Sequence, residues 1–143
     1  MAPVSQKTSP LTTSPFREKL LNVRGSLLNL HKALILAEQV TYERINGRVP
    51  STGQLLQLVL NDPWFTWLHP LSQLVVRIDD LLDDESELSL VEVEHFLIEA
   101  RNLIRPSEQG DGFGRSYYEA LQREPDVIFA HAEVKKLLAK IVA

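Results

Sequence analysis

Residues 15–46 read PFREKLLNVRGSLLNLHKALILAEQVTYERIN, and this stretch decides the fold. Ser14 and Pro15 form an N-cap followed by proline at the first helical position. Gly47, with Pro50 beyond it, supplies a C-terminal stop. Between these signals the apolar side chains recur with the period of an α-helix. The stretch therefore predicts one helix of about 32 residues, roughly 48 Å long at 1.5 Å per residue.

Polar residues interrupt the apolar arc of this predicted helix. Arg24, His31 and Glu38 recur every seven residues, so they share one line along the helix, and Tyr42 continues the line one turn further. Polar groups at core positions cost several kcal/mol unless they are satisfied. His131, at the edge of the apolar face of the last predicted helix, would join the line if the two helices are neighbours. We call these five residues the polar seam.

Three explanations of the polar seam remain open. Its members could hydrogen-bond one another and the neighbouring helices. They could mark a homodimer or partner interface, because buried polar residues fix register in helical packing. Or they could line a pocket, with His31 or Glu38 as base or ligand and Arg24 holding an anion.

Capping signals predict further helices along the chain. Ser51 and Gln54 form one capping box, Ser89 and Glu92 form another, and Asp62 is an N-cap followed by proline. The expected helices span about 52–60, 63–82 with a kink or break at Pro70, 90–105, a short segment around 117–121, and 125 to the end of the chain. Strand patterns are weak. The fold class is all-α: a single-domain helical bundle over 15–143 with about four main helices, behind a disordered tail at 1–14.

Composition and charge exclude several classes of protein. The chain has no cysteine, which excludes disulfide scaffolds, thiol enzymes and Cys-ligated zinc sites. The net charge of −4 argues against a general nucleic-acid binder. No segment approaches the roughly 18 consecutive apolar residues that span a bilayer. We therefore expect no nucleic-acid partner, no membrane and a cytoplasmic location.

Glu92 and His95 form the chain's E-x-x-H sequence, which in di-iron bundles places a carboxylate and an imidazole on one helix face. Those sites need two such motifs, and only one is present. Glu92 also has a simpler role in the Ser89 capping box. The pair is thus a weak metal candidate on a solvated face, and we expect no metal and no cofactor.

Two aromatic residues are candidates for contact: Phe65 with a short helix, a ligand or a partner, and Phe129 with a docking partner. Phe65 falls off the apolar stripe that Trp64 and Trp67 share, and Phe129 lies opposite the apolar face of the last helix.

The sequence contains no complete catalytic motif. The first helix outreaches the others, so its overhang would expose apolar surface unless a second chain covers it. We expect a non-enzymatic interaction or structural module, acting as a homodimer or a partner-binding bundle. The alternative is a small-molecule- or metal-binding bundle with a polar pocket on the first helix, an enzyme among the forms it could take.

Overall fold

The computed structural model describes residues 15–84 and 88–139, and within these residues it contains helices and no strand. The all-α prediction is confirmed. The expected tail at 1–14 and the last expected helical residues, 140–143, lie outside the described residues. The helices are α2 (Pro15–Asn46), α3 (Thr52–Asn61), the 3-10 helix η2 (Pro63–Leu68), α4 (His69–Asp83), α5 (Leu90–Leu103), α6 (Gly112–Arg123) and α7 (Pro125–Ala139).

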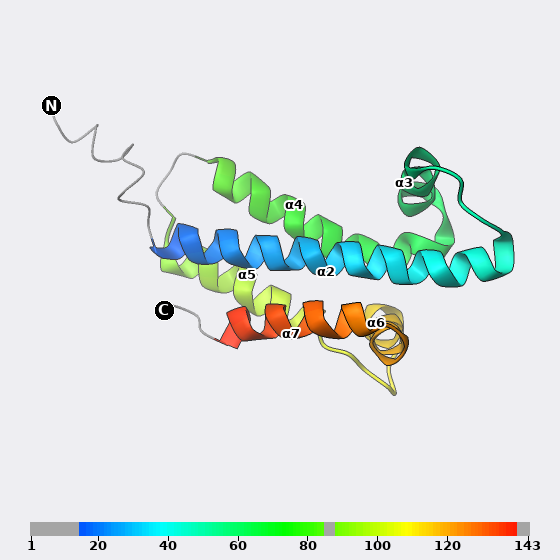
Figure 1. The fold of residues 1–143 in the computed structure, drawn as a ribbon. Helices are drawn as coiled ribbons and strands as arrows, with labels where there is room; N and C mark the ends of the chain where they lie inside the picture. The colour runs from blue at the N-terminus through cyan, green and yellow to red at the C-terminus, as the bar shows by residue number, and fades with distance from the viewer. Residues whose placement is uncertain (1–14, 85–87, 140–143) are drawn as a thin grey trace, which may run out of the picture.

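The long first helix, α2, has the predicted bounds and spans 32 residues. It ends at Gly47, whose φ of 89° lies in the left-handed region that glycine adopts without a steric penalty. The Gly47 N–H donates to the carbonyl oxygen of Glu43 at 3.0 Å. The chain then reverses, and α3 packs beside the 3-10 helix η2 near the far end of α2 (Figure 1).

Four helices form the bundle, with α4 along one side of α2, α7 along the other and α5 behind (Figure 1). Both neighbours run antiparallel to α2, because the start of α2 meets the end of each. The Arg17 guanidinium donates to the Leu82 carbonyl at 2.7 Å, and the Lys19 ammonium donates to the Leu137 carbonyl. The prediction of about four main helices with shorter additions fits this arrangement.

The core lies where α2, α4, α5 and α7 face one another, and η2 and α6 extend it toward the C-terminal half of α2. Its largest fully buried side chains are Val23, Leu20, Leu27, Leu30, Leu34, Phe65, Leu68, Leu71, Leu74, Ile78, Leu97 and Tyr117. Among the described helices, none combines the length and the apolar composition that a bilayer crossing requires.

The segment around Pro70 breaks into two helices, as the sequence allowed. Pro70 falls in the first turn of α4, where the N–H that proline lacks has no helical partner anyway. The preceding turn is a 3-10 helix with three residues per turn, so residues three apart share a face. Phe65 and Leu68 are therefore the buried pair, whereas Trp64 and Trp67 are half-buried. An α-helical period places the two tryptophans on the core side, and the 3-10 turn changes that assignment.

Phe65 and Phe129 offer a matched test of this packing. Phe65 is 0% exposed and Phe129 is 71% exposed. We expect Phe65→Ala to lower the free energy of unfolding by about 3–5 kcal/mol, because it leaves a cavity in the core. Phe129→Ala should stay within about 0.5 kcal/mol of the parent. Urea denaturation followed by circular dichroism measures both, and similar losses in the two variants would contradict the packing described.

Candidate functional site

The polar seam meets different neighbours along α2. Near its start, the Arg24 guanidinium binds the Asp79 carboxylate of α4, with both side chains about a third exposed. Further along, Arg123 Nη2 of α6 donates to Glu38 Oε2 at 2.6 Å, and the Glu38 side chain is only 10% exposed. The two ion pairs thus join α2 to two different helices.

His31 lies between these pairs and is half-buried. Burial lowers the pKa of its imidazole, and the nearby His69 lowers it further. The Nε2 atom of His69 lies 3.2 Å from the Val59 carbonyl oxygen, within hydrogen-bond distance. His31 is therefore held as a neutral ring near neutral pH.

Tyr42, the last seam residue on α2, packs among aromatic rings of η2. Its ring lies 5.5 Å from that of Trp64 in an edge-to-face arrangement and 5.7 Å from that of Phe65. The contact that the sequence proposed for Phe65 is therefore made within the chain, by its own helix η2 against α2.

His131 of α7 meets α6. The Tyr117 hydroxyl lies within hydrogen-bond distance of His131 Nδ1, and the two rings contact edge to face. Burial raises the pKa of Tyr117, and burial together with the nearby Lys135 lowers the pKa of His131. Both groups are therefore uncharged at neutral pH, and the Tyr117 O–H donates to Nδ1.

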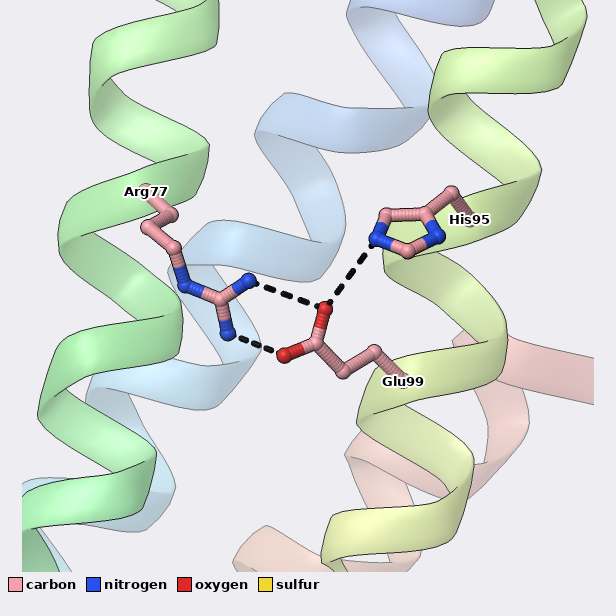
Figure 2. Close-up of polar contacts among 3 residues, drawn as sticks. All are labelled: Arg77, His95 and Glu99. Atoms are coloured by element: carbon pink, nitrogen blue, oxygen red, sulfur yellow. Dashed lines mark hydrogen bonds and ion pairs between the residues drawn. The ribbon is translucent and has the colours of Figure 1, made fainter.

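Glu92 and His95 lie on the exposed side of α5. Glu92 completes the predicted capping box, because its carboxylate accepts from the Ser89 N–H at 3.0 Å. His95 Nε2 lies 3.6 Å from the Glu99 carboxylate, which the Arg77 guanidinium of α4 binds with both of its terminal nitrogens (Figure 2). The Arg77 hydrogen bonds lower the pKa of Glu99. This cluster joins α4 to α5 at the surface.

Figure 2 shows one imidazole and one carboxylate beside a guanidinium, which is an ion-pair arrangement and not a metal ligand set. Within residues 15–84 and 88–139, no group of three or more His, Cys, Asp or Glu side chains is placed to hold a metal ion.

The side of α2 that faces away from the core carries a second row of apolar residues. Leu21, Leu28, Leu36 and Val40 are between 39% and 48% exposed. Gly25 lies between the first two, the charged residue Glu18 precedes the row, and Lys32 lies within it between Leu28 and Leu36. We call this surface, with Asn22 and Asn29, the outward face of α2. A helix that is apolar on two sides has more apolar surface than its own bundle covers.

Val76 of α4 extends this surface sideways. The Arg24–Asp79 ion pair sets the register between the two antiparallel helices. One turn toward the C-terminus of α2 from Arg24 is Leu28, and one turn toward the N-terminus of α4 from Asp79 is Val76. Val76 is 55% exposed and thus lies level with the outward face.

A scan against protein-family models, a search of curated proteins and a search of solved structures each found no match to the chain.

The partners Asp79, Arg123 and Tyr117 are the site residues that sequence reasoning missed. Each lies on a different helix from the residue it binds, 14 to 85 positions away in the sequence. A polar residue near the apolar stripe of a second helix, as Tyr117 is in α6, is the signal that would have identified them.

The ion pair that the buried Glu38 makes is tested by removing its cation. Arg123→Gln leaves the Glu38 carboxylate buried without its partner, and we expect the free energy of unfolding to fall by about 1–3 kcal/mol. Glu119→Gln is the matched control, because Glu119 pairs with Arg115 four residues away on the exposed side of the same helix. That change should cost about 0.5 kcal/mol or less. Equal losses, measured by urea denaturation, would refute the assignment of Glu38 to a buried pair.

The two half-buried histidines, His31 and His131, predict a dependence of stability on pH. The pKa of each histidine is lowered in the folded chain, whereas in the unfolded chain each has the ordinary histidine pKa of about 6.5. The unfolded chain therefore binds protons at a higher pH than the folded chain does. The free energy of unfolding should therefore fall as the pH drops below about 6.5. Thermal denaturation between about pH 8 and pH 5 should show this fall, and the double variant His31→Gln/His131→Gln should show a shallower one.

The control for this experiment is His95→Gln. The His95 side chain is 69% exposed, so its loss should leave the fall at acid pH in place. A double variant with the same acid-side slope as the parent chain would show that other groups cause the pH dependence.

Proposed function

We propose that the protein is an interaction module that self-associates, and that the outward face of α2 forms the contact between two copies. Gly25 carries this proposal. It lies inside a 32-residue helix with ordinary helical angles, where glycine costs about 1 kcal/mol relative to alanine. A Cβ atom added at Gly25 would meet nothing within 4 Å, so nothing in the described part of the chain requires glycine here. Close approach by another backbone from outside is the physical reason that remains.

The sequence around Gly25 is symmetric in a way that suits a second copy of the same helix. Two antiparallel α2 helices crossing at Gly25 place each residue n positions after it opposite the residue n positions before it in the other copy. Lys32, seven positions after Gly25, then faces Glu18, seven positions before it, and the contact occurs twice. Leu21, four positions before Gly25, lies within one residue of the position opposite Leu28, three positions after it, so the two leucines are close enough to pack against each other across the axis. A two-fold contact of this kind is closed and stops at a dimer.

The seam supports a non-enzymatic protein. Arg24 and Glu38 of α2 bind α4 and α6, and His131 of α7 binds α6. Reacting groups of an enzyme converge on one site, whereas these residues form three separate links between pairs of helices. The pocket alternative on the first helix therefore has less support than the outward face.

The molar mass in solution tests the proposal directly. Multi-angle light scattering of the parent chain should give twice 16.2 kDa. Gly25→Gln should give the monomer mass, because its side chain blocks the crossing point. The variant should also melt at a higher temperature in its monomeric form, because glutamine is a better helix former by about 0.5–1 kcal/mol. Loss of the dimer therefore cannot result from loss of the fold.

Charge reversal gives the specific control. Lys32→Glu should weaken the dimer, because it places two carboxylates opposite each other at both ends of the contact. The double variant Glu18→Lys/Lys32→Glu restores opposite charges and should restore the dimer. A monomeric parent chain would overturn the proposal, and a dimer that tolerates Gly25→Gln would move the contact away from this face.

A further inference from the structure

A second surface lies between the end of α5 and the last described turns of α7. It is a hollow of about 360 Å³, a size within the usual range for small-molecule sites. Its polar lining consists of Arg101, Arg105, Lys135 and His131. Its apolar lining consists of Ile104, Pro106, Leu138 and Ala139. The residues that line it include three cations and no carboxylate.

Among the described residues, only one of the three cations around the hollow, Arg101, binds a backbone carbonyl of a neighbouring helix. The hollow lies at the C-terminal end of α5, which carries a partial negative charge of about half a unit, and beside the last described turn of α7. Arg101 binds this turn of α7, because its guanidinium donates to the Leu138 carbonyl through Nη2 at 2.7 Å and Nε at 3.2 Å. Arg105 and Lys135 are exposed and add two further charges. The hollow is therefore electropositive overall.

Two of the lining groups are held in place before any ligand arrives. The bonds to Leu138 fix the Arg101 guanidinium and leave its Nη1 hydrogens uncommitted by this contact. The hydroxyl of the fully buried Tyr117 fixes the His131 ring through Nδ1. With Nδ1 accepting, the ring proton is on Nε2, so His131 offers a neutral donor to the hollow. Groups fixed in this way lose little entropy when they bind a ligand.

We propose that this hollow binds a small phosphate monoester with an apolar substituent. Guanidinium groups bind phosphate oxygens with two parallel hydrogen bonds, and a dianion matches several cations better than a single carboxylate does. Arg101 lies in the last turn of α5 and Arg105 lies two residues beyond the end of this helix, and both side chains line the hollow. Ile104, Pro106 and Leu138 provide the apolar surface against which the substituent packs. The proposal is independent of self-association, because none of these residues lies on α2.

Calorimetric titration of the full chain with phenyl phosphate tests the proposal. We expect phenyl phosphate to bind more tightly than inorganic phosphate, which lacks the apolar group, and more tightly than benzoate, which carries one charge. Arg105→Gln and Lys135→Gln should each weaken phenyl phosphate binding by about tenfold, the size expected for one charge-assisted contact. Arg101 is left unchanged because its guanidinium also donates to the Leu138 carbonyl of α7, so its loss would affect the packing of that helix.

Lys136→Gln is the matched control. It removes the same charge from the neighbouring position of α7, and Lys136 is exposed and does not line the hollow. This variant should bind phenyl phosphate as the parent chain does. Equal weakening by Lys135→Gln and Lys136→Gln would overturn the proposal, because it would show attraction by net charge alone. Absence of binding, or benzoate binding as tightly as phenyl phosphate, would overturn it as well.

The source of the phosphate is distinguished by a further arm. Vesicles that contain phosphatidic acid present the same phosphate monoester at a lipid surface. If the parent chain and Lys136→Gln sediment with these vesicles and Lys135→Gln does not, the ligand is a lipid headgroup. Binding of soluble phenyl phosphate without sedimentation identifies a free small molecule.

Discussion

The structure depends on the burial of one stripe of α2. Leu20, Leu27, Leu30 and Leu34 have no exposed surface, and α4, α5 and α7 are arranged so that each covers part of this stripe. Each buried leucine contributes about 1.5–3 kcal/mol from removal of apolar surface from water. Because α2 is surrounded on three sides, its surface is divided between core, flanks and one outward face. The positions of the polar residues follow from that division.

The polar seam lies where the flanks of α2 meet other helices, and this explains its chemistry. A polar side chain at such a boundary is partly shielded from water, so it needs a hydrogen-bond or ion-pair partner from the protein. The position is also close enough to the surface that it does not require an apolar residue. Arg24 and Glu38 therefore take ion-pair partners from the helices that border them, Asp79 in α4 and Arg123 in α6. Pairs of this kind fix which helices are neighbours and in what register, and they add little net stability.

The two proposed binding surfaces arise from different physical features. The outward face of α2 combines exposed leucines with a glycine that costs helix stability and at which an added Cβ atom would meet nothing within 4 Å in the described chain. The hollow between α5 and α7 combines an excess of positive charge with donors fixed by Leu138 and Tyr117. One surface suits a flat, apolar, symmetric contact, and the other suits a small anion. They share no residue, so a protein of this fold can use both at once.

The sequence by itself determined the helices, because their signals are local. The Pro15 start, the Gly47 stop and the Ser89 capping box act over a few residues through backbone hydrogen bonds, and the structure has all three. Tertiary structure decided what required distant segments: the burial of Phe65, which depends on a 3-10 turn, and the partners of Glu38 and His131. The cationic hollow unites residues 101–106 with 131–139, and no local pattern specifies that approach, because it results from the packing of α5 and α7 around α2.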